Sequence, residues 1–180
     1  MSPVEVILAA VAVIVLLASW VGWTSVRIDR LLGRTTSART SLDAQLVRRA
    51  AALQALVERS AGALGPERAE RLRLLAAASL HADPSTREAA ENDLSRALHD
   101  IPADVDEALL GDLIDAARRV AFARRFYNDA VRDTVALRRG RVPRLFRLGG
   151  RRPLPAFFEI DDTAPRVVRP AAAGSPPPRG

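Results

Sequence analysis

The sequence predicts an all-α protein with a single N-terminal transmembrane helix, an antiparallel up-down bundle of about four helices, and a disordered proline-rich tail. Three observations predict this fold class. A long apolar run lies near residue 10, strong helix formers (Ala, Leu, Arg and Glu) dominate the middle, and prolines gather after residue 142. With 180 residues and a formal net charge of +6, the chain has room for about one domain.

Composition excludes most enzyme classes. The chain has no cysteine, which rules out disulfides, thiolate metal sites and a cysteine nucleophile. All 27 basic residues are arginine, so no lysine is present to form a Schiff base or to serve a phosphate-binding loop. Aromatic residues make up 4% of the chain, too few for a surface that stacks single-stranded nucleic acid. We therefore expect no enzyme activity and no cofactor.

The first element is a predicted transmembrane helix over residues 4–26. Residues 6–18 are apolar without interruption, and Trp20 and Trp23 stand where an interfacial aromatic anchor belongs. About 20 apolar residues are enough to cross the hydrocarbon core. A cleaved signal peptide would carry a basic segment before the run, and here the flanking charge is Glu5. A buried core helix of this length would normally have a polar face.

The charges beside the apolar run predict its orientation. Four arginines follow it, namely Arg27, Arg30, Arg34 and Arg39. Positively charged flanks stay in the cytoplasm. We therefore expect residues 1–3 outside the cell and the rest of the chain, from residue 27 onward, on the cytoplasmic side.

Residues 27–140 form the predicted helical bundle. No proline or glycine occurs from Thr35 to Ala61, so the membrane helix is expected to continue as one rod to about Ser60, with a weak point at Gly33. Its apolar stripe has spacings of three and four: Leu42, Leu46, Ala50, Leu53 and Leu56 or Val57. The neighbouring charges are expected off that stripe: Arg48, Arg49, Glu58 and Arg59.

Turn signals divide the rest of the bundle. Gly65-Pro66 opens a second helix that runs to about His81. Asp83-Pro84 has the pattern of an N-cap with proline at the first helical position, and it predicts a third helix to about His99. Ile101-Pro102 ends that helix, and Asp104 or Asp106 opens a fourth that stops near Arg139-Gly140. The fourth stripe is Leu109, Leu113, Ala117, Val120, Tyr127, Val131 and Val135, flanked by Phe122 and Phe126.

The C-terminal part of the chain lacks helical periodicity. Residues 141–162 contain Pro143, Pro153 and Pro155 among arginines, and we interpret them as an extended segment that packs on the bundle or on the membrane surface. Residues 163–180 are rich in proline and are predicted to be disordered. A proline-rich tail can bind an SH3-like partner, but a charged PxxP ligand pattern is missing, which favours a plain flexible end.

Three stretches of the chain follow a pattern known from a family of bacterial membrane proteins. Residues 123–131 read Ala-Arg-Arg-Phe-Tyr-Asn-Asp-Ala-Val, residues 41–49 read Ser-Leu-Asp-Ala-Gln-Leu-Val-Arg-Arg, and residues 154–159 read Leu-Pro-Ala-Phe-Phe-Glu. In their order along the chain these stretches resemble the LemA family, whose signature is Tyr-Asn-x-x-Val. The resemblance covers about residues 4–162. It implies a helical bundle on one N-terminal membrane helix in the bacterial plasma membrane, and it implies no established enzymatic activity.

The chain departs from that family in two places. Thr134-Val135 stands where a second Tyr-Asn-like element is common, and residues 53–57 lack the proline of the corresponding family stretch. We therefore interpret the chain as similar to a short, divergent branch of the family.

The candidate site residues on the fourth helix are Tyr127, Asn128 and Val131. Tyr127 lies on the apolar stripe, where its ring can be buried and its hydroxyl can bond a neighbouring helix. This favours a packing role over a ligand site, since buried polar groups mostly satisfy one another. His81, Asp83 and His99 could be imagined as metal ligands, but the two histidines are expected on different faces and three ligands do not converge, so we expect no metal site.

Charge is distributed unevenly along the chain. Residues 61–117 carry 5 arginines and 12 acidic residues, a net of −7, whereas residues 118–152 carry 12 arginines and 2 acidic residues, a net of +10. In an up-down bundle the fourth helix returns to the membrane, where anionic lipid attracts basic residues. The predicted lipid or partner contacts are Arg138, Arg139, Arg141, Arg144, Arg147, Arg151 and Arg152. Nucleic acid could bind the same charge, but no recognition motif supports it.

Together these patterns predict a non-enzymatic, single-pass membrane protein whose helical bundle acts as a scaffold or recruits protein partners. The competing interpretation is a ligand-sensing or accessory subunit of a membrane enzyme, with a polar site near Tyr127. The identity of the protein partner and the oligomeric state stay open, because long amphipathic helices also pair between chains.

Overall fold

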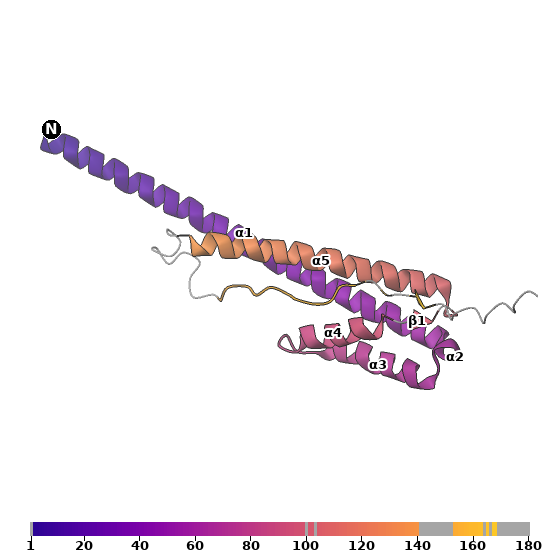
Figure 1. Ribbon diagram of the computed structural model, residues 1–180. Helices are drawn as coiled ribbons and strands as arrows, with labels where there is room; N and C mark the ends of the chain where they lie inside the picture. Colours follow the sequence, from indigo (N-terminus) through magenta and orange to yellow (C-terminus); the bar gives the residue numbers. More distant parts are fainter. Residues whose placement is uncertain are drawn as a thin grey trace, which may run out of the picture. The chain divides into compact units, whose positions relative to one another are not determined.

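The computed structural model describes residues 2–99, 101–102, 104–140, 153–163, 165 and 167–168. Within these residues the chain is mostly helical, with five helices and one pair of short strands. Figure 1 labels the helices, and the chain divides into two compact units. Unit 1 is Met1–Arg39 with Phe126–Phe157, and unit 2 is Thr40–Arg125 with Phe158–Gly180. The mostly helical class predicted from the sequence is confirmed.

Helix α1, Pro3–Arg59, is a single helix from the apolar run to the end of the predicted rod. A capping box starts it: the Glu5 N–H donates to Ser2 Oγ (3.3 Å), and the Ser2 N–H donates to Glu5 Oε2 (3.0 Å). The expected weak point at Gly33 does not interrupt the helix. The charge at the edge of the apolar run therefore serves to begin α1.

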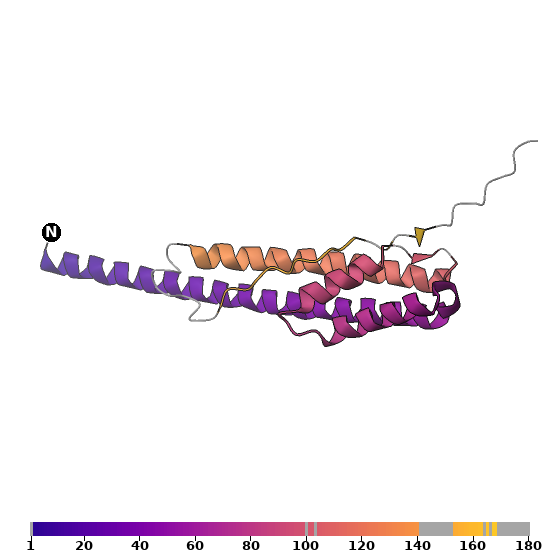
Figure 2. The same ribbon diagram turned by 60° about the horizontal axis from the view of Figure 1, so that its bottom comes forward.

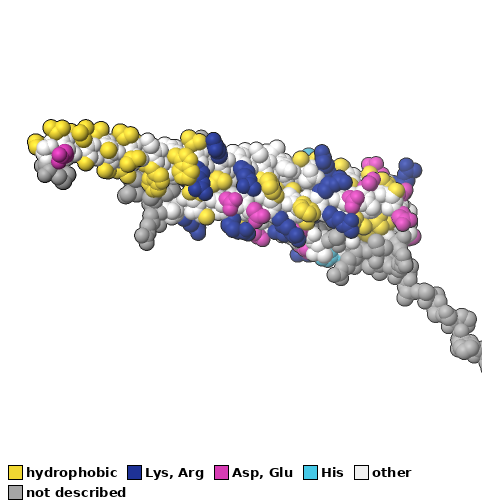
Figure 3. Space-filling model, turned by 90° about the horizontal axis from the view of Figure 1, so that it is seen from above, with side chains coloured by type: hydrophobic (Ala, Val, Ile, Leu, Met, Phe, Trp, Pro, Cys, Tyr) yellow, Lys and Arg dark blue, Asp and Glu magenta, His cyan; other side chains and the backbone are white. Residues whose placement is uncertain are grey.

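The apolar part of α1 is exposed on all sides. None of its most apolar 18-residue window is buried. Figure 3 shows apolar side chains covering this end of the helix. By length and composition it is the one helix, within the described part of the chain, that could cross a membrane. Its full exposure in unit 1 is unlike the buried core helix of a soluble protein.

In unit 1, threonines join α1 to the C-terminal part of α5, which spans Glu107–Arg139. The Thr35 hydroxyl lies 2.9 Å from Thr134 Oγ1 and 3.2 Å from the Ala130 carbonyl oxygen. Both threonines are buried, and so are Ile28, Ala38, Ala130 and Val131. Within unit 1, buried hydroxyl contacts therefore link α1 to α5.

In unit 2, three further helices follow α1: α2 (Ala61–Leu64), α3 (Pro66–His81) and α4 (Arg87–Ala97). Figures 1 and 2 both show α3 and α4 as an antiparallel pair beside the end of α1. Gly65 separates α2 from α3 with φ 75°, a conformation in which glycine avoids the strain of a Cβ atom. The short helix α2 has no counterpart among the predicted elements.

The predicted start of the third helix is wrong. Helix α4 begins at Arg87 rather than at Asp83-Pro84. The Asp83 carbonyl instead accepts hydrogen bonds from the backbone N–H groups of Thr86 (2.9 Å) and Arg87 (2.8 Å), which closes a turn. Asp83-Pro84 therefore forms the connection before α4 and not its cap. The C-terminal end is also earlier than expected, since Leu98 and His99 follow the helix.

The core of unit 2 combines residues from every helix of the unit. The predicted stripe on α1 is confirmed, because all its members are buried. The prediction that Arg49 lies off this stripe is wrong, because its side chain is 2% exposed. The core cluster comprises Leu53, Leu56, Val57, Leu64, Ala69, Leu72, Ala76, Leu94, Leu98, Ile101, Val105, Leu110 and Leu113.

Helix α5 begins where one of the two predicted caps places it. Asp106 Oδ1 accepts a hydrogen bond from the Leu109 N–H (3.0 Å), which is the geometry of an N-cap. The helix ends at Arg139, as expected. Its predicted stripe is buried or half-buried throughout, whereas the flanking Phe122 and Phe126 are exposed.

One short pairing involves the stretch that was predicted to be disordered. Strand β1 (Ile101–Pro102) pairs in parallel with β2 (Val167–Val168). At these two valines the prediction of disorder is wrong. Of the other residues of the predicted tail, 164, 166 and 169–180 lie outside the described residues.

Candidate functional site

The residues of the Tyr-Asn-x-x-Val motif lie buried in unit 1. Tyr127 is 6% exposed, and its hydroxyl donates to the Ala156 carbonyl oxygen (2.8 Å). The sequence suggested that the acceptor would lie on a neighbouring helix. It lies instead in an extended segment. The Arg39 guanidinium lies 5.6 Å from the ring centroid. Asn128 and Val131 are also buried, so the three side chains have the surroundings of packing residues.

The predicted basic contact segment is described only in part. Arg138 and Arg139 form the last turn of α5. Arg138 Nη1 donates to the Pro153 carbonyl oxygen (3.2 Å). The other five predicted contacts lie outside the described residues: Arg141, Arg144, Arg147, Arg151 and Arg152.

The residues considered as metal ligands do not converge. His81 and Asp83 are exposed, and His99 lies beside the C-terminal segment of unit 2. Across the described ranges, no group of three or more His, Cys, Asp or Glu side chains could hold a metal ion. Unit 2 does, however, contain two polar clusters that sequence reasoning missed.

The first cluster is a buried ion pair between α1 and α4. Arg49 Nη2 donates to Glu91 Oε2, and neither side chain is more than 2% exposed. Two buried serines complete it. Arg49 Nη1 donates to Ser95 Oγ (3.1 Å), and the Ser79 hydroxyl donates to Glu91 Oε1 (2.7 Å). A charged pair in a dry core is tolerated when its remaining donors and acceptors are satisfied.

On the α1 side of this cluster, some buried polar atoms have no hydrogen-bond partner among the described residues. Arg49 Nε is buried and has no hydrogen-bond partner among the described residues, and the same holds for Gln45 Oε1 one turn earlier. A sequence signal for the cluster did exist. Arg49 follows Leu46 by three positions and precedes Leu53 by four, which places it within the apolar stripe.

The second cluster holds a segment near the C-terminal end of unit 2, residues Phe158–Thr163, here called the strap. Two of its side chains, Phe158 and Ile160, are buried. The strap has no regular secondary structure, yet its first three side chains alternate as in a strand: Phe158 and Ile160 are buried and Glu159 is exposed. This alternating pattern covers too few residues to be recognised in the sequence, so the docking of the strap could not be predicted.

Charged side chains fix the acidic end of the strap. Arg124 donates to Asp162 Oδ2 from both Nε (3.2 Å) and Nη2 (2.7 Å). Its Nη1 also lies 3.9 Å from Glu159 Oε2. His99 Nε2 lies 3.4 Å from Asp161 Oδ2, within ion-pair distance but without hydrogen-bond geometry.

The strap also changes the acidity of one of its own residues. The pKa of Asp161 is lowered, first by the hydrogen bond from the Thr163 hydroxyl and then by the one from the Thr163 N–H, while His99 adds a smaller effect. A carboxyl group whose pKa is lower in the folded state stabilises the fold at neutral pH, and this contribution is lost as the pH falls through the folded pKa.

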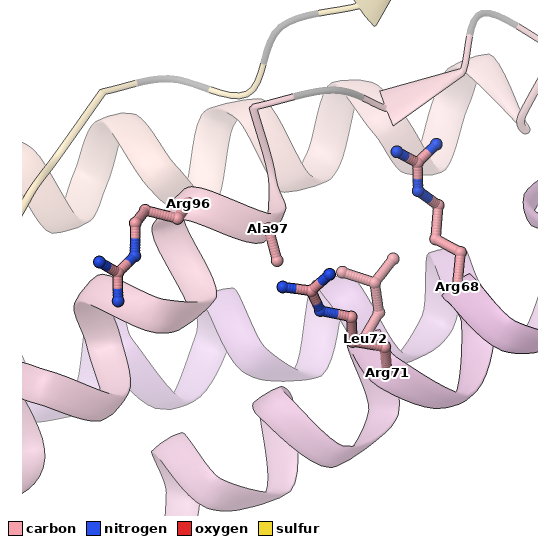
Figure 4. Close-up of a pocket in the computed structure, with 5 residues that line it drawn as sticks. All are labelled: Arg68, Arg71, Leu72, Arg96 and Ala97. Carbon is pink, nitrogen blue, oxygen red and sulfur yellow. The ribbon is translucent and has the colours of Figure 1, made fainter.

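A third polar feature is an arginine-lined cleft of about 130 Å³ between α3 and α4. Its lining residues are Arg68, Arg71, Leu72, Arg96 and Ala97. Figure 4 shows the three guanidinium groups pointing in different directions. Arg96 is also paired with Asp93. The arginines therefore do not form a common anion site in this arrangement.

In comparisons with known proteins, no family model, no curated protein and no solved structure matches the chain.

Proposed function

We propose that the chain is a LemA-like single-pass membrane protein without enzymatic activity, whose helical bundle recruits protein partners at the cytoplasmic face of the bacterial plasma membrane. In this proposal the helices form an up-down bundle. The Tyr127 surroundings favour this function over the ligand-sensing alternative, because the ring is covered and the hydroxyl is already bonded to Ala156.

One observation carries the proposal: the apolar part of α1 is exposed on every side. Side chains such as Leu8, Ile14 and Leu16 are each more than 60% exposed. An apolar surface of this size in water would promote aggregation, and a bilayer would cover it. Trp23 lies at the end of this surface, with the Arg27 guanidinium 5.7 Å from its ring centroid, an arrangement suited to the headgroup region.

The anchor can be tested by placing charge in the middle of the apolar part. We expect a double substitution, Val11→Arg with Ile14→Arg, to remove the chain from alkali-washed membranes, since each central arginine costs about 2.5–3.5 kcal/mol on insertion. Val47→Arg is the matched control, because Val47 is an exposed apolar residue of the same helix outside the predicted span. A reporter fused at the C-terminus should be active only if it is a cytoplasmic type.

Two results would contradict the anchor, and a third would contradict its orientation. The double variant would remain in the membrane as Val47→Arg does, or a shortened product would indicate cleavage of a signal peptide. Activity of an extracytoplasmic reporter alone would overturn the orientation.

The proposed lipid contact of the basic segment has its own readout, because trypsin cleaves after arginine. We expect cleavage between residues 138 and 151 of the full chain to slow when it is reconstituted in anionic vesicles, since each arginine gains roughly 1 kcal/mol near such a surface. High salt should restore the rate by screening the charges. Equal cleavage on neutral and anionic vesicles would exclude the contact.

A further inference from the structure

The strap is bound to unit 2 in the manner of a peptide ligand. On α4, Glu88 Oε1 accepts the Glu159 N–H (3.0 Å) and Asn92 Oδ1 accepts the Asp161 N–H (2.7 Å). Two alternate backbone amides of the strap are thus bonded to side chains of a helix. The backbone amides of a bound extended segment ordinarily donate to backbone carbonyl groups at the edge of a sheet.

The spacing of these two acceptors explains how a helix can take the place of a strand. Glu88 and Asn92 are four residues apart, and four residues of helix rise about 6 Å. Glu159 and Asp161 are two residues apart, and two residues of extended chain rise about 6.6 Å. One turn of α4 therefore matches one two-residue repeat of the strap.

The side-chain contacts of the strap would select a bound segment by its sequence. The side chains of Phe158 and Ile160 are buried, whereas Glu159 between them is exposed. Arg124 donates to Asp162 Oδ2 from two nitrogens, and hydrogen bonds between charged groups are stronger than those between neutral groups. A one-residue shift of a bound segment would place its apolar side chains on the wrong face.

From these contacts we infer that the surface formed by Glu88, Asn92, His99 and Arg124, here called the strap site, is a docking site for an extended segment of a partner protein. The partner segment has two apolar side chains two residues apart, the first aromatic, followed by two carboxylates. The chain's own strap occupies the site, and the partner segment binds by displacing it. The strap itself, seated on the site, specifies this chemistry.

The inference deepens the proposed recruiting function and rests on it. The test concerns the full chain in detergent micelles, so peptide binding and membrane anchoring are measured separately. Loss of anchoring would leave the peptide result standing, and a negative peptide result would leave the anchor in place.

The test uses a fluorescent synthetic peptide with the sequence of residues 156–165. We expect it to bind a full-length chain whose strap is disabled by Phe158→Asp with Ile160→Asp, and to bind the unchanged chain at least 10-fold more weakly. Adding Arg124→Ala should weaken binding by about 10–100-fold, the usual loss for a hydrogen bond to a charged group. Arg118→Ala is the matched control, since Arg118 pairs with Asp115 on the same helix.

A second measurement uses the unchanged chain, in case the disabled variant does not fold. Excess unlabelled peptide should speed hydrogen exchange at the amides of Glu159 and Asp161, because it displaces the strap. A peptide with its phenylalanine and isoleucine each moved by one position should have no effect.

Three outcomes overturn the inference. The peptide fails to bind and also leaves the exchange unchanged, or Arg124→Ala and Arg118→Ala bind it equally well. The third is a concentration-dependent dimer in which the strap of a second copy fills the site, since this makes the occupant another copy of the chain and not a different partner.

Discussion

Replacing Arg49 by methionine is expected to destabilise unit 2 by about 3–5 kcal/mol. The change leaves the Glu91 carboxylate fully buried without its main partner. Among the described residues, the nearest remaining cation is Arg87, whose Nη1 lies 4.0 Å from Glu91 Oε1. Native-state hydrogen exchange of the α3 and α4 amides in the full chain measures this free energy within unit 2.

Two further variants test whether the loss comes from the buried charge of Glu91. One is a control at an exposed arginine, and the other removes both charges of the ion pair. Arg48→Met changes an exposed arginine one position earlier and should alter stability by less than about 0.5 kcal/mol. The double substitution Arg49→Met with Glu91→Met should recover most of the loss, because no unpaired charge stays buried. If Arg49→Met proves as mild as Arg48→Met, the ion pair does not matter for the fold.

The second large effect is expected at Leu72 on α3. Leu72→Ala should destabilise unit 2 by about 2–5 kcal/mol, because it opens a cavity in the core cluster. Leu74 is two residues further along the same helix and is 62% exposed. Leu74→Ala should therefore change the free energy of unfolding by less than about 0.5 kcal/mol.

This pair of leucines is a direct test of the arrangement of α3. The same exchange experiment reports both variants, and both substitutions remove the same atoms from the same helix. A similar loss at Leu72 and Leu74 would mean that α3 presents a different face to the core. The chemistry of the side chain cancels in the comparison, so the difference reports burial.

Periodic elements of this chain could be predicted from the sequence. The stripe on α1 repeats at helical spacing for more than four turns, and every member is buried as expected. The end of α5 and the helix from Pro66 to His81 were also predicted correctly, because proline and glycine act locally. Asp83-Pro84 misled the prediction because a turn and an N-cap use the same residues.

Features that depend on distant partners could not be predicted. Arg49 and Glu91 are 42 residues apart, and nothing in either local sequence identifies the other. The docking of the strap depends on Arg124 and α4 in the same way. The Tyr127 hydroxyl was expected to bond, but its acceptor lies 29 residues away in a segment without periodicity.

During synthesis of the chain, the strap is made later than the helices that bind it. Phe158 and Ile160 leave the ribosome after every helix of unit 2, because the last helical residue of that unit is Arg125. At roughly 5–20 residues per second, the synthesis of residues 126–158 takes about 2–7 s. During this interval every residue of the unit 2 helices has been synthesised, and the strap site has no occupant in the same chain. A nascent chain is therefore open at this site before its own strap arrives to close it.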